Sequence, residues 1–310
     1  MTIRAMLGPQ RQAPHIAAII AELDCGAAPV CTVTAGWQER EGELSELEQH
    51  LSKRAVDLAL YQRAEQVFEA DQSFREAYRR RQETLVYMQR LYRRRLRHAL
   101  SALEELSREK RESTILENER RAALRAIKTL DAQHLRRIRA IHEQFDNGMP
   151  SATRPAIATH RLELAELLDG AGALLIAGGH VQVLLNRLRL FGLLDLAENK
   201  PVIAWSAGAM CLADRIILFH DFPPQGAGDA EVAEAGLGLF PGVVPLPHAS
   251  QRLNLDDRQR TSVFSRRFSP ARSVTLDPGA ILIWRDDRLL AAKEAYRLTR
   301  NGSLGGMRTG

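Results

Sequence analysis

Residues 200–210 read KPVIAWSAGAM, and this stretch decides the fold class. Its first half is a short apolar run that predicts a buried strand. The small residues around Ser206 predict a tight turn into a helix over residues 211–217. Residues 26–37 and 171–179 show the same pattern, an apolar run that ends in small residues. Buried strands of this kind are typical of parallel sheets, so we expect an α/β body.

A long segment without helix breakers interrupts this pattern. From Glu43 to Asn147, 105 residues contain neither glycine nor proline, which predicts long helices. Apolar residues between Leu85 and Leu103 recur at spacings of three to five, as in an amphipathic helix. A break is expected at residues 111–114, where a serine or threonine can cap a second helix. We therefore expect two antiparallel arms, the first of about 48 residues and about 70 Å, that project beyond the body.

The return from these arms is marked by the turn sequence NGMP at residues 147–150. We expect the α/β body to consist of residues 1–60 and 150–310, with residues 61–149 inserted as a helical hairpin. The strand that ends near residue 34 is expected at the centre of the sheet. Its carboxyl end carries a dense polar cluster, and ligands bind at such ends in open α/β sheets.

Composition narrows the class of protein. With 45% hydrophobic and 26% charged residues, the 310-residue chain is not of a disordered, collagen-like or disulfide-scaffold kind. The three cysteines, Cys25, Cys31 and Cys211, form no CxxC pair, so we expect neither a disulfide framework nor a metal. No apolar run is long enough for a membrane span or signal peptide. We expect a cytoplasmic protein without membrane contact.

The net charge of +5 comes from the helical segment, where residues 61–146 carry 20 Lys and Arg against 14 Asp and Glu. Arginines cluster at residues 79–81, 93–97 and 136–139, with tyrosines among them. Phosphate contacts are one interpretation. Interleaved glutamates favour ion pairs along the helices instead, so nucleic acid is not the expected partner. We expect the arms to form a homodimer, to cover the active site, or to contact a partner protein.

Ser206 admits two interpretations. In a nucleophile elbow, small neighbours let the backbone bend sharply and lift the serine hydroxyl onto a helix N-terminus. The usual pattern is G-x-S-x-G, and here Ala204 replaces the first glycine. The alternative is a serine that caps a buried helix.

Further segments decide between these interpretations. Residues 177–180 read AGGH, and residues 205–209 read WSAGA. Residues 221–223, DFP, begin 15 positions after the serine, and residues 247–252 contain a Pro-His pair followed by Arg252. In this order, over residues 170–255, the chain resembles peptidase family S51. That is the peptidase E and cyanophycinase group of the class I glutamine amidotransferase-like superfamily. The resemblance implies a flavodoxin-like body, here with an inserted hairpin.

The resemblance also implies catalytic roles. Ser206 would be the nucleophile, His248 the general base, and Asp221 the acid that orients the imidazole. His180 and His220 compete for the role of base and rank below His248. A serine in place of the cysteine of true glutamine amidotransferases disfavours glutaminase activity.

The oxyanion would be held by the backbone N–H of Ala207 and of Gly178 or Gly179. Residue 180 is histidine where peptidase E has asparagine, so we expect His180 to contact substrate differently. Arg252 or Arg215 could pair with a substrate carboxylate.

The polar cluster after the first predicted strand supplies further candidates for substrate contact, namely Gln38, Glu39 and Arg40. Helix capping by the acidic residues is the alternative.

Two functions follow. The first is a serine hydrolase that cleaves a short peptide or isopeptide amide through an acyl-enzyme, without a cofactor. The second is an inactive relative that binds a partner protein or nucleic acid through its arginine-rich arms.

Overall fold

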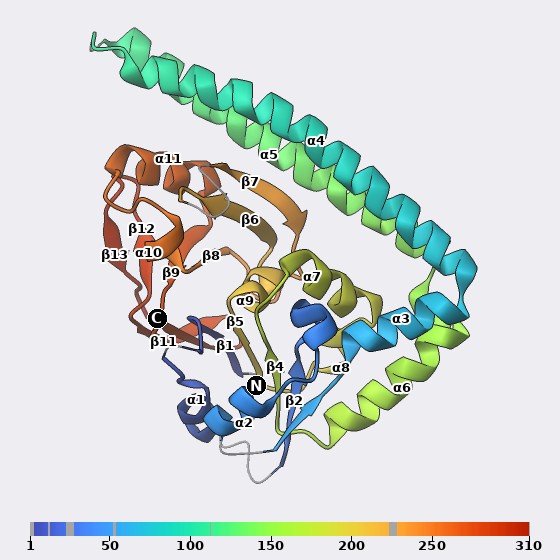
Figure 1. Ribbon diagram of the computed structural model, residues 1–310. Coiled ribbons are helices and arrows are strands. Elements are labelled where there is room, and N and C mark those ends of the chain that lie inside the picture. Colours follow the sequence, from blue (N-terminus) through green and yellow to red (C-terminus); the bar gives the residue numbers. More distant parts are fainter. Residues whose placement is uncertain are drawn as a thin grey trace.

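Figure 1 shows the computed structural model, which describes residues 3–11, 13–22, 28–51, 54–111, 113–222 and 228–309. Cys25 and Pro223 lie outside the described residues. Within them, Cys31 and Cys211 are buried free thiols. No helix of the described part is long and apolar enough to cross a membrane.

A seven-stranded sheet forms the centre of the body, in the order β11-β10-β1-β5-β4-β2-β3. The strands from β1 to β3 in this order run parallel, and β10 and β11 extend the sheet antiparallel. The predicted α/β fold, a mostly parallel sheet flanked by helices, is confirmed. The strand bounds are β1 (Ile3–Leu7), β2 (Val30–Val33), β3 (Ala55–Asp57), β4 (Ala173–Ile176), β5 (Val202–Trp205), β10 (Ile281–Arg285) and β11 (Arg288–Lys293).

The expectation that the strand ending near residue 34 is central is wrong. β2 lies next to the edge strand β3, and β5 occupies the middle position. The sequence analysis overlooked β1, which inserts between β10 and β5. The polar cluster after β2 therefore lies toward the β3 edge of the sheet and not at its centre.

Side chains alternate between the two faces of the sheet. In β4, Leu174 and Ile176 join the core under one layer of helices, whereas Ala173 and Leu175 join the core on the opposite face. The first layer contains α3 (Leu60–Ala70), α6 (Pro155–Asp169), α7 (Val181–Leu190), α8 (Leu193–Leu196) and α9 (Ala207–Leu212). The second contains α1 (Ile16–Glu22) and α2 (Ser45–Leu51).

Smaller elements complete the body beside the main sheet. A four-stranded sheet has the order β13-β12-β9-β8, and β6 pairs with β7 as a separate ribbon. These strands are β6 (Arg215–His220), β7 (Gly228–Ala235), β8 (Val243–Pro247), β9 (Arg272–Leu276), β12 (Tyr296–Leu298) and β13 (Leu304–Gly306). The short helices are η1 (Ala35–Arg40), η2 (Ser151–Thr153), α10 (Ala249–Arg252) and α11 (Arg258–Phe268).

The expected helical hairpin is present as α4 (Gln72–Arg108) and α5 (Thr114–Gly148). Ser113 caps α5, and its side chain accepts a hydrogen bond from the N–H of Leu116 at 3.1 Å. The first arm has 37 residues rather than about 48. The chain breaks at Asp71, whose carboxylate caps α4 by accepting from the N–H of Phe74 at 3.0 Å. This cap ends the preceding helix without glycine or proline.

Contrary to expectation, the arms lie along the body for most of their length. Figure 1 shows them across β7 and α11, with only the end where they join extending past α11. Arg267 of α11 forms a buried ion pair with Asp131 of α5 at 2.7 Å. Tyr92 of α4 donates to the same carboxylate at 2.8 Å and accepts from the N–H of Val232 at 3.2 Å. These contacts fix both arms to the body.

Candidate active site

Three parallel strands end together at one edge of the main sheet. The register aligns Val33 of β2 with Ile176 of β4, and Ile176 with Ala204 of β5. The segments that follow these strands therefore meet at the same edge. They are η1 after β2, the Gly178-Gly179 loop after β4, and Ser206 after β5. Sequence patterns located each of these segments, and the sheet register brings them together.

Ser206 stands in a strained turn between β5 and α9. Its backbone has φ 51° and ψ −121°, a conformation in which a residue other than glycine is rare. The half-buried side chain makes no capping hydrogen bond to α9. The helix-cap interpretation is therefore not supported, because the Ser206 side chain does not bond to the N-terminus of α9.

Two glycines allow the backbone to close around this serine. A Cβ on Gly178 would lie 2.9 Å from the Cβ of Ser206 and 3.6 Å from the backbone nitrogen of Ala207. A Cβ on Gly208 would lie 2.4 Å from the carbonyl oxygen of Ile176. Ala207 is the first residue of α9, where the N–H has no acceptor within the helix. A carbonyl oxygen next to Ser206 would find this donor.

His248 faces the same cavity from the turn between β8 and α10. Its backbone is left-handed, with φ 57° and ψ 38°, and its N–H donates to the carbonyl oxygen of Leu276 at 3.1 Å. Burial and the charge of Arg252 lower the pKa of His248, while the charge of Asp277 and a hydrogen bond with Gln251 oppose this shift. A lowered pKa keeps the imidazole neutral and able to accept a proton near neutral pH.

Asp277 is a functional candidate that sequence reasoning missed. The parallel pair β8 and β9 aligns Pro247 with Leu276, so the next residues along each strand are His248 and Asp277. The Asp277 carboxylate accepts from the N–H and the hydroxyl of Ser250 at 3.0 and 2.9 Å. A strand followed by the turn sequence DPG, residues 277–279, was the available signal.

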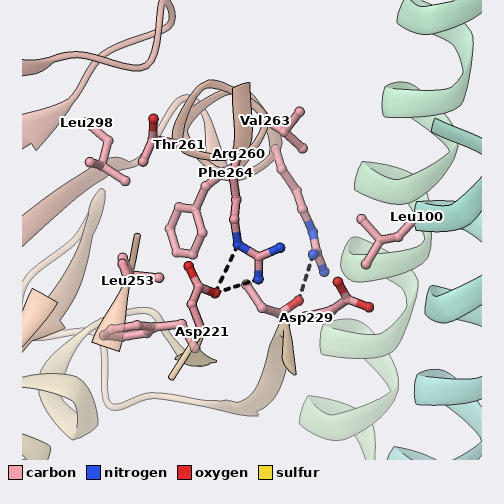
Figure 2. A pocket seen from close by; sticks show the side chains of 12 residues that line it. Leu100, Asp221, Asp229, Leu253, Arg260, Thr261, Val263, Phe264 and Leu298 are labelled. Carbon is pink, nitrogen blue, oxygen red and sulfur yellow. Dashed lines mark hydrogen bonds and ion pairs between the residues drawn. The ribbon is translucent and has the colours of Figure 1, made fainter. Parts of the chain in front are cut away.

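Asp221, which the resemblance assigned to orient His248, is used elsewhere. One carboxylate oxygen accepts from Nε of Arg260 at 2.9 Å, and the other accepts from the N–H of Asn254 at 2.9 Å. Figure 2 shows the Asp221 carboxylate turned toward Arg260 in a small pocket under α11. The Asp221 N–H also donates to the carbonyl oxygen of Arg252 at 2.6 Å. Asp221 therefore braces the segment that follows His248, and no hydrogen bond between its carboxylate and the imidazole is found among the described residues.

The cavity at Ser206 has a volume of about 500 Å³. Of the predicted residues, it brings together Gly178, Gly179, Ser206, Ala207, His248, Arg252 and Arg40. Several lining residues were not foreseen, among them Gln10, Arg11, Trp37, Glu43, Glu46 and His50.

Other predicted residues do not line this cavity. His180 caps α7 by accepting from the N–H of Val183 at 3.3 Å, and Glu39 accepts from the hydroxyl of Tyr61 at 3.2 Å. Gln38 has φ 59° and ψ −120°, close to the values of Ser206, and shapes the η1 loop through its backbone. His220 and Arg215 lie on β6, also outside the cavity lining.

The arginines that line the cavity differ in their partners. Arg40 forms an ion pair with Glu43 at 2.6 Å, and Arg11 forms one with Glu46 at 3.1 Å. Arg252 has no ion pair among the described residues, and burial lowers the pKa of its guanidinium. Arg252 is thus the cavity-lining arginine available to a substrate carboxylate.

Comparisons with known proteins agree with this geometry. The fold and the site define an α/β protein in which a serine and a histidine line one cavity at the carboxyl edge of the sheet. The model of peptidase family S51 matches residues 132–291, which include Ser206 and His248, and the chain belongs to this family.

Solved structures similar to this chain include a peptidase from an acI-B1 Actinobacterium, with 11% sequence identity and a TM-score of 0.49. That match covers 100% of this chain and 95% of the other. A Listeria monocytogenes EGD-e protein described as a peptidase E has 11% identity and a TM-score of 0.46, with 96% and 100% coverage. No curated protein matches the chain in sequence.

Proposed function

We propose that this protein is a serine peptidase that hydrolyses a short peptide or isopeptide amide through an acyl-enzyme on Ser206. The observation that carries the proposal is the conformation of Ser206. A strained serine whose side chain makes no helix-capping hydrogen bond lines the same cavity as a histidine whose pKa is lowered. Strain of this kind persists where the surroundings hold it in place, and it clusters at active sites.

The reaction follows from the positions of these groups. His248 takes the hydroxyl proton as Ser206 Oγ attacks the substrate carbonyl carbon. The N–H of Ala207 and the backbone of the Gly178-Gly179 loop hold the oxyanion. When the C–N bond breaks, the leaving amine receives the proton from His248. Water then attacks the ester carbonyl while His248 takes a proton from that water. The bond between the acyl carbon and Ser206 Oγ breaks, His248 returns the proton to Oγ, and the acid product leaves.

The acid that supports His248 is, in this proposal, Asp277. Its negative charge opposes the lowering of the His248 pKa and stabilises the imidazolium that forms during attack. Asp221 contributes by holding the backbone after His248. An exchange of Asp277→Asn is expected to lower kcat and to move the pH profile. Asp221→Asn is expected to lower stability and to leave the profile of the remaining activity in place.

The substrate is proposed to be small and to carry a carboxylate. Arg252 supplies a guanidinium without an ion pair in the described ranges, and it is the last residue of α10, four positions after His248. The other arginines of the lining, Arg40 and Arg11, are already paired with glutamates. A short peptide with one free carboxylate fits this distribution better than a polyanion.

The alternative function, binding through the arginine-rich arms, has less support. Arg93 of α4 is already paired with Glu231 at 2.6 Å, and Arg79 is paired with Glu83 at 2.9 Å. These two contacts engage charges that a phosphate would otherwise bind.

The test is covalent labelling with a fluorophosphonate probe, read by intact mass. Wild type and Ser101→Ala, an exposed serine on α4, should gain one label. Ser206→Ala should gain none, and His248→Ala should gain it far more slowly. A label that persists in Ser206→Ala would refute the assignment. Turnover is then measured on Asp-X dipeptides and β-aspartyl peptides.

A further inference from the structure

A second cavity, of about 490 Å³, lies where the roots of α4 and α5 meet α7 and β7. We refer to it as the root cavity. It shares no lining residue with the cavity at Ser206. Aromatic rings form part of its wall, and the charged residues that line it are Arg81, Arg139, His142, Glu143, Asp146 and Arg189.

Arg81 is the central charge of the root cavity. Only 8% of this residue is exposed, and its guanidinium carbon lies 4.5 Å from the ring centre of Tyr78 and 4.1 Å from that of Phe145. Its Nε has no hydrogen-bond partner, and Arg81 forms no ion pair within the part of the chain that the structure describes. The carboxylates of Asp146 and Glu234 act on this guanidinium through their charge, but neither forms an ion pair with it among the described residues, so the buried Nε of Arg81 stays unsatisfied on this side of the cavity.

Arg189 approaches the same cavity from the end of α7. Its Nη2 donates to the carbonyl oxygen of Ala235 at 2.6 Å, but its Nη1 has no hydrogen-bond partner. Glu234 is 3.8 Å from Nη1, and its Oε1 already accepts from Nε2 of His142 and from the N–H of Ala235. His142 keeps a buried Nδ1 without a partner.

Buried donors that lack acceptors are uncommon in folded proteins, and here two of them, Nε of Arg81 and Nη1 of Arg189, belong to residues that line one cavity. Burial also lowers the pKa of both Arg81 and Arg189, as expected for guanidinium groups that water solvates poorly.

The remaining charges limit the ligand to a small molecule. Glu143 and Asp146 are exposed residues of the cavity lining, as is Arg139, which donates to the carbonyl oxygen of Asp214 at 3.4 Å. The exposed carboxylates of Glu143 and Asp146 would repel a polyanion. A ligand with a single negative charge could still reach the buried arginines of the lining.

We propose that the root cavity binds a small molecule with one oxyanion head group, a carboxylate or a phosphate, held by Arg81 and Arg189. Both arginines offer planar pairs of donors that suit either head group. Such a site is independent of the reaction at Ser206.

The experiment is isothermal titration calorimetry with sodium acetate and with inorganic phosphate, each against sodium chloride at equal ionic strength. Saturable binding of at least one anion is expected, and the tighter of the two identifies the head group. Arg81→Gln should weaken this binding at least tenfold. Arg79→Gln, an exposed arginine on the same helix, is the matched control and should leave it unchanged.

Three results would overturn the proposal. The first is no binding of either anion beyond that of chloride. The second is equal weakening by Arg79→Gln and Arg81→Gln. The third is weakening by Arg252→Gln alone, which would place the anion at Ser206. If Arg81→Gln does not fold by circular dichroism, Arg189→Gln decides, with the same tenfold loss expected.

Discussion

Replacement of Ser206 by glycine should remove activity and at the same time stabilise the protein. The backbone at Ser206, with φ 51° and ψ −121°, is one that glycine adopts freely and that costs other residues about 1–3 kcal/mol. Alanine at the same position keeps the strain and also removes the hydroxyl. The comparison of Ser206→Gly with Ser206→Ala therefore isolates the strain of the backbone.

The size of the effect follows from two opposing contributions. Relief of strain favours glycine by about 1–3 kcal/mol, and the greater freedom of glycine in the unfolded chain opposes it by about 0.5–1 kcal/mol. The net expectation is a free energy of unfolding about 0.5–2 kcal/mol higher for Ser206→Gly than for Ser206→Ala. In domains of 150–250 residues, 1 kcal/mol corresponds to about 2–4 °C in the thermal midpoint.

The assay is thermal and urea unfolding followed by circular dichroism. Gln38 provides a matched second site, because its φ of 59° and ψ of −120° nearly equal those of Ser206. Gln38→Gly should exceed Gln38→Ala by a similar amount. If Ser206→Gly is no more stable than Ser206→Ala, the strain argument fails, and with it the main physical support for a preorganised nucleophile.

Three further predictions concern the site and the hairpin. Gly178→Ala places a Cβ 2.9 Å from that of Ser206, so peptide turnover should fall by about 10²-fold or more while circular dichroism stays unchanged; full activity would contradict the close approach. Asp277→Asn removes a charge that raises the pKa of His248, which is already below its ordinary value of 6.5. The acid limb of the plot of kcat/KM against pH should therefore move to still lower pH. An unmoved limb would exclude Asp277 as the partner of His248. Asp131→Asn leaves the guanidinium of Arg267 on α11 buried without its counter-ion, so the free energy of unfolding should fall by about 3–5 kcal/mol in urea titrations. A loss below about 1 kcal/mol would show that this pair does not anchor the arms.

Much of the fold was predictable because its signals are local. Apolar runs such as the one ending at Trp205 mark buried strands, and the long stretch without glycine or proline marks helices. Ser113 was predicted as a cap and is one. The break at Asp71 was not predicted, because an aspartate inside a helical pattern ends a helix only if its carboxylate bonds to the backbone.

The candidate site was predictable only in part. Ser206, His248 and Gly178 were named from sequence and line one cavity. His180 was named as a substrate contact but caps a helix instead, and Trp37 was not named although it lines the cavity. Side-chain direction decides these roles, and sequence spacing does not report it.

The sequence by itself determined three buried strands of the main sheet, the helical hairpin and the position of the serine turn, because hydrophobic periodicity and small residues act over a few neighbours along the chain. Only the tertiary structure decided which acid lies level with His248. Asp221 and Asp277 are both acidic residues beyond strand ends, and the parallel register of β8 and β9 brings Asp277 level with His248, while Arg260 engages Asp221. Such pairing depends on contacts between residues far apart in sequence, which local patterns do not encode.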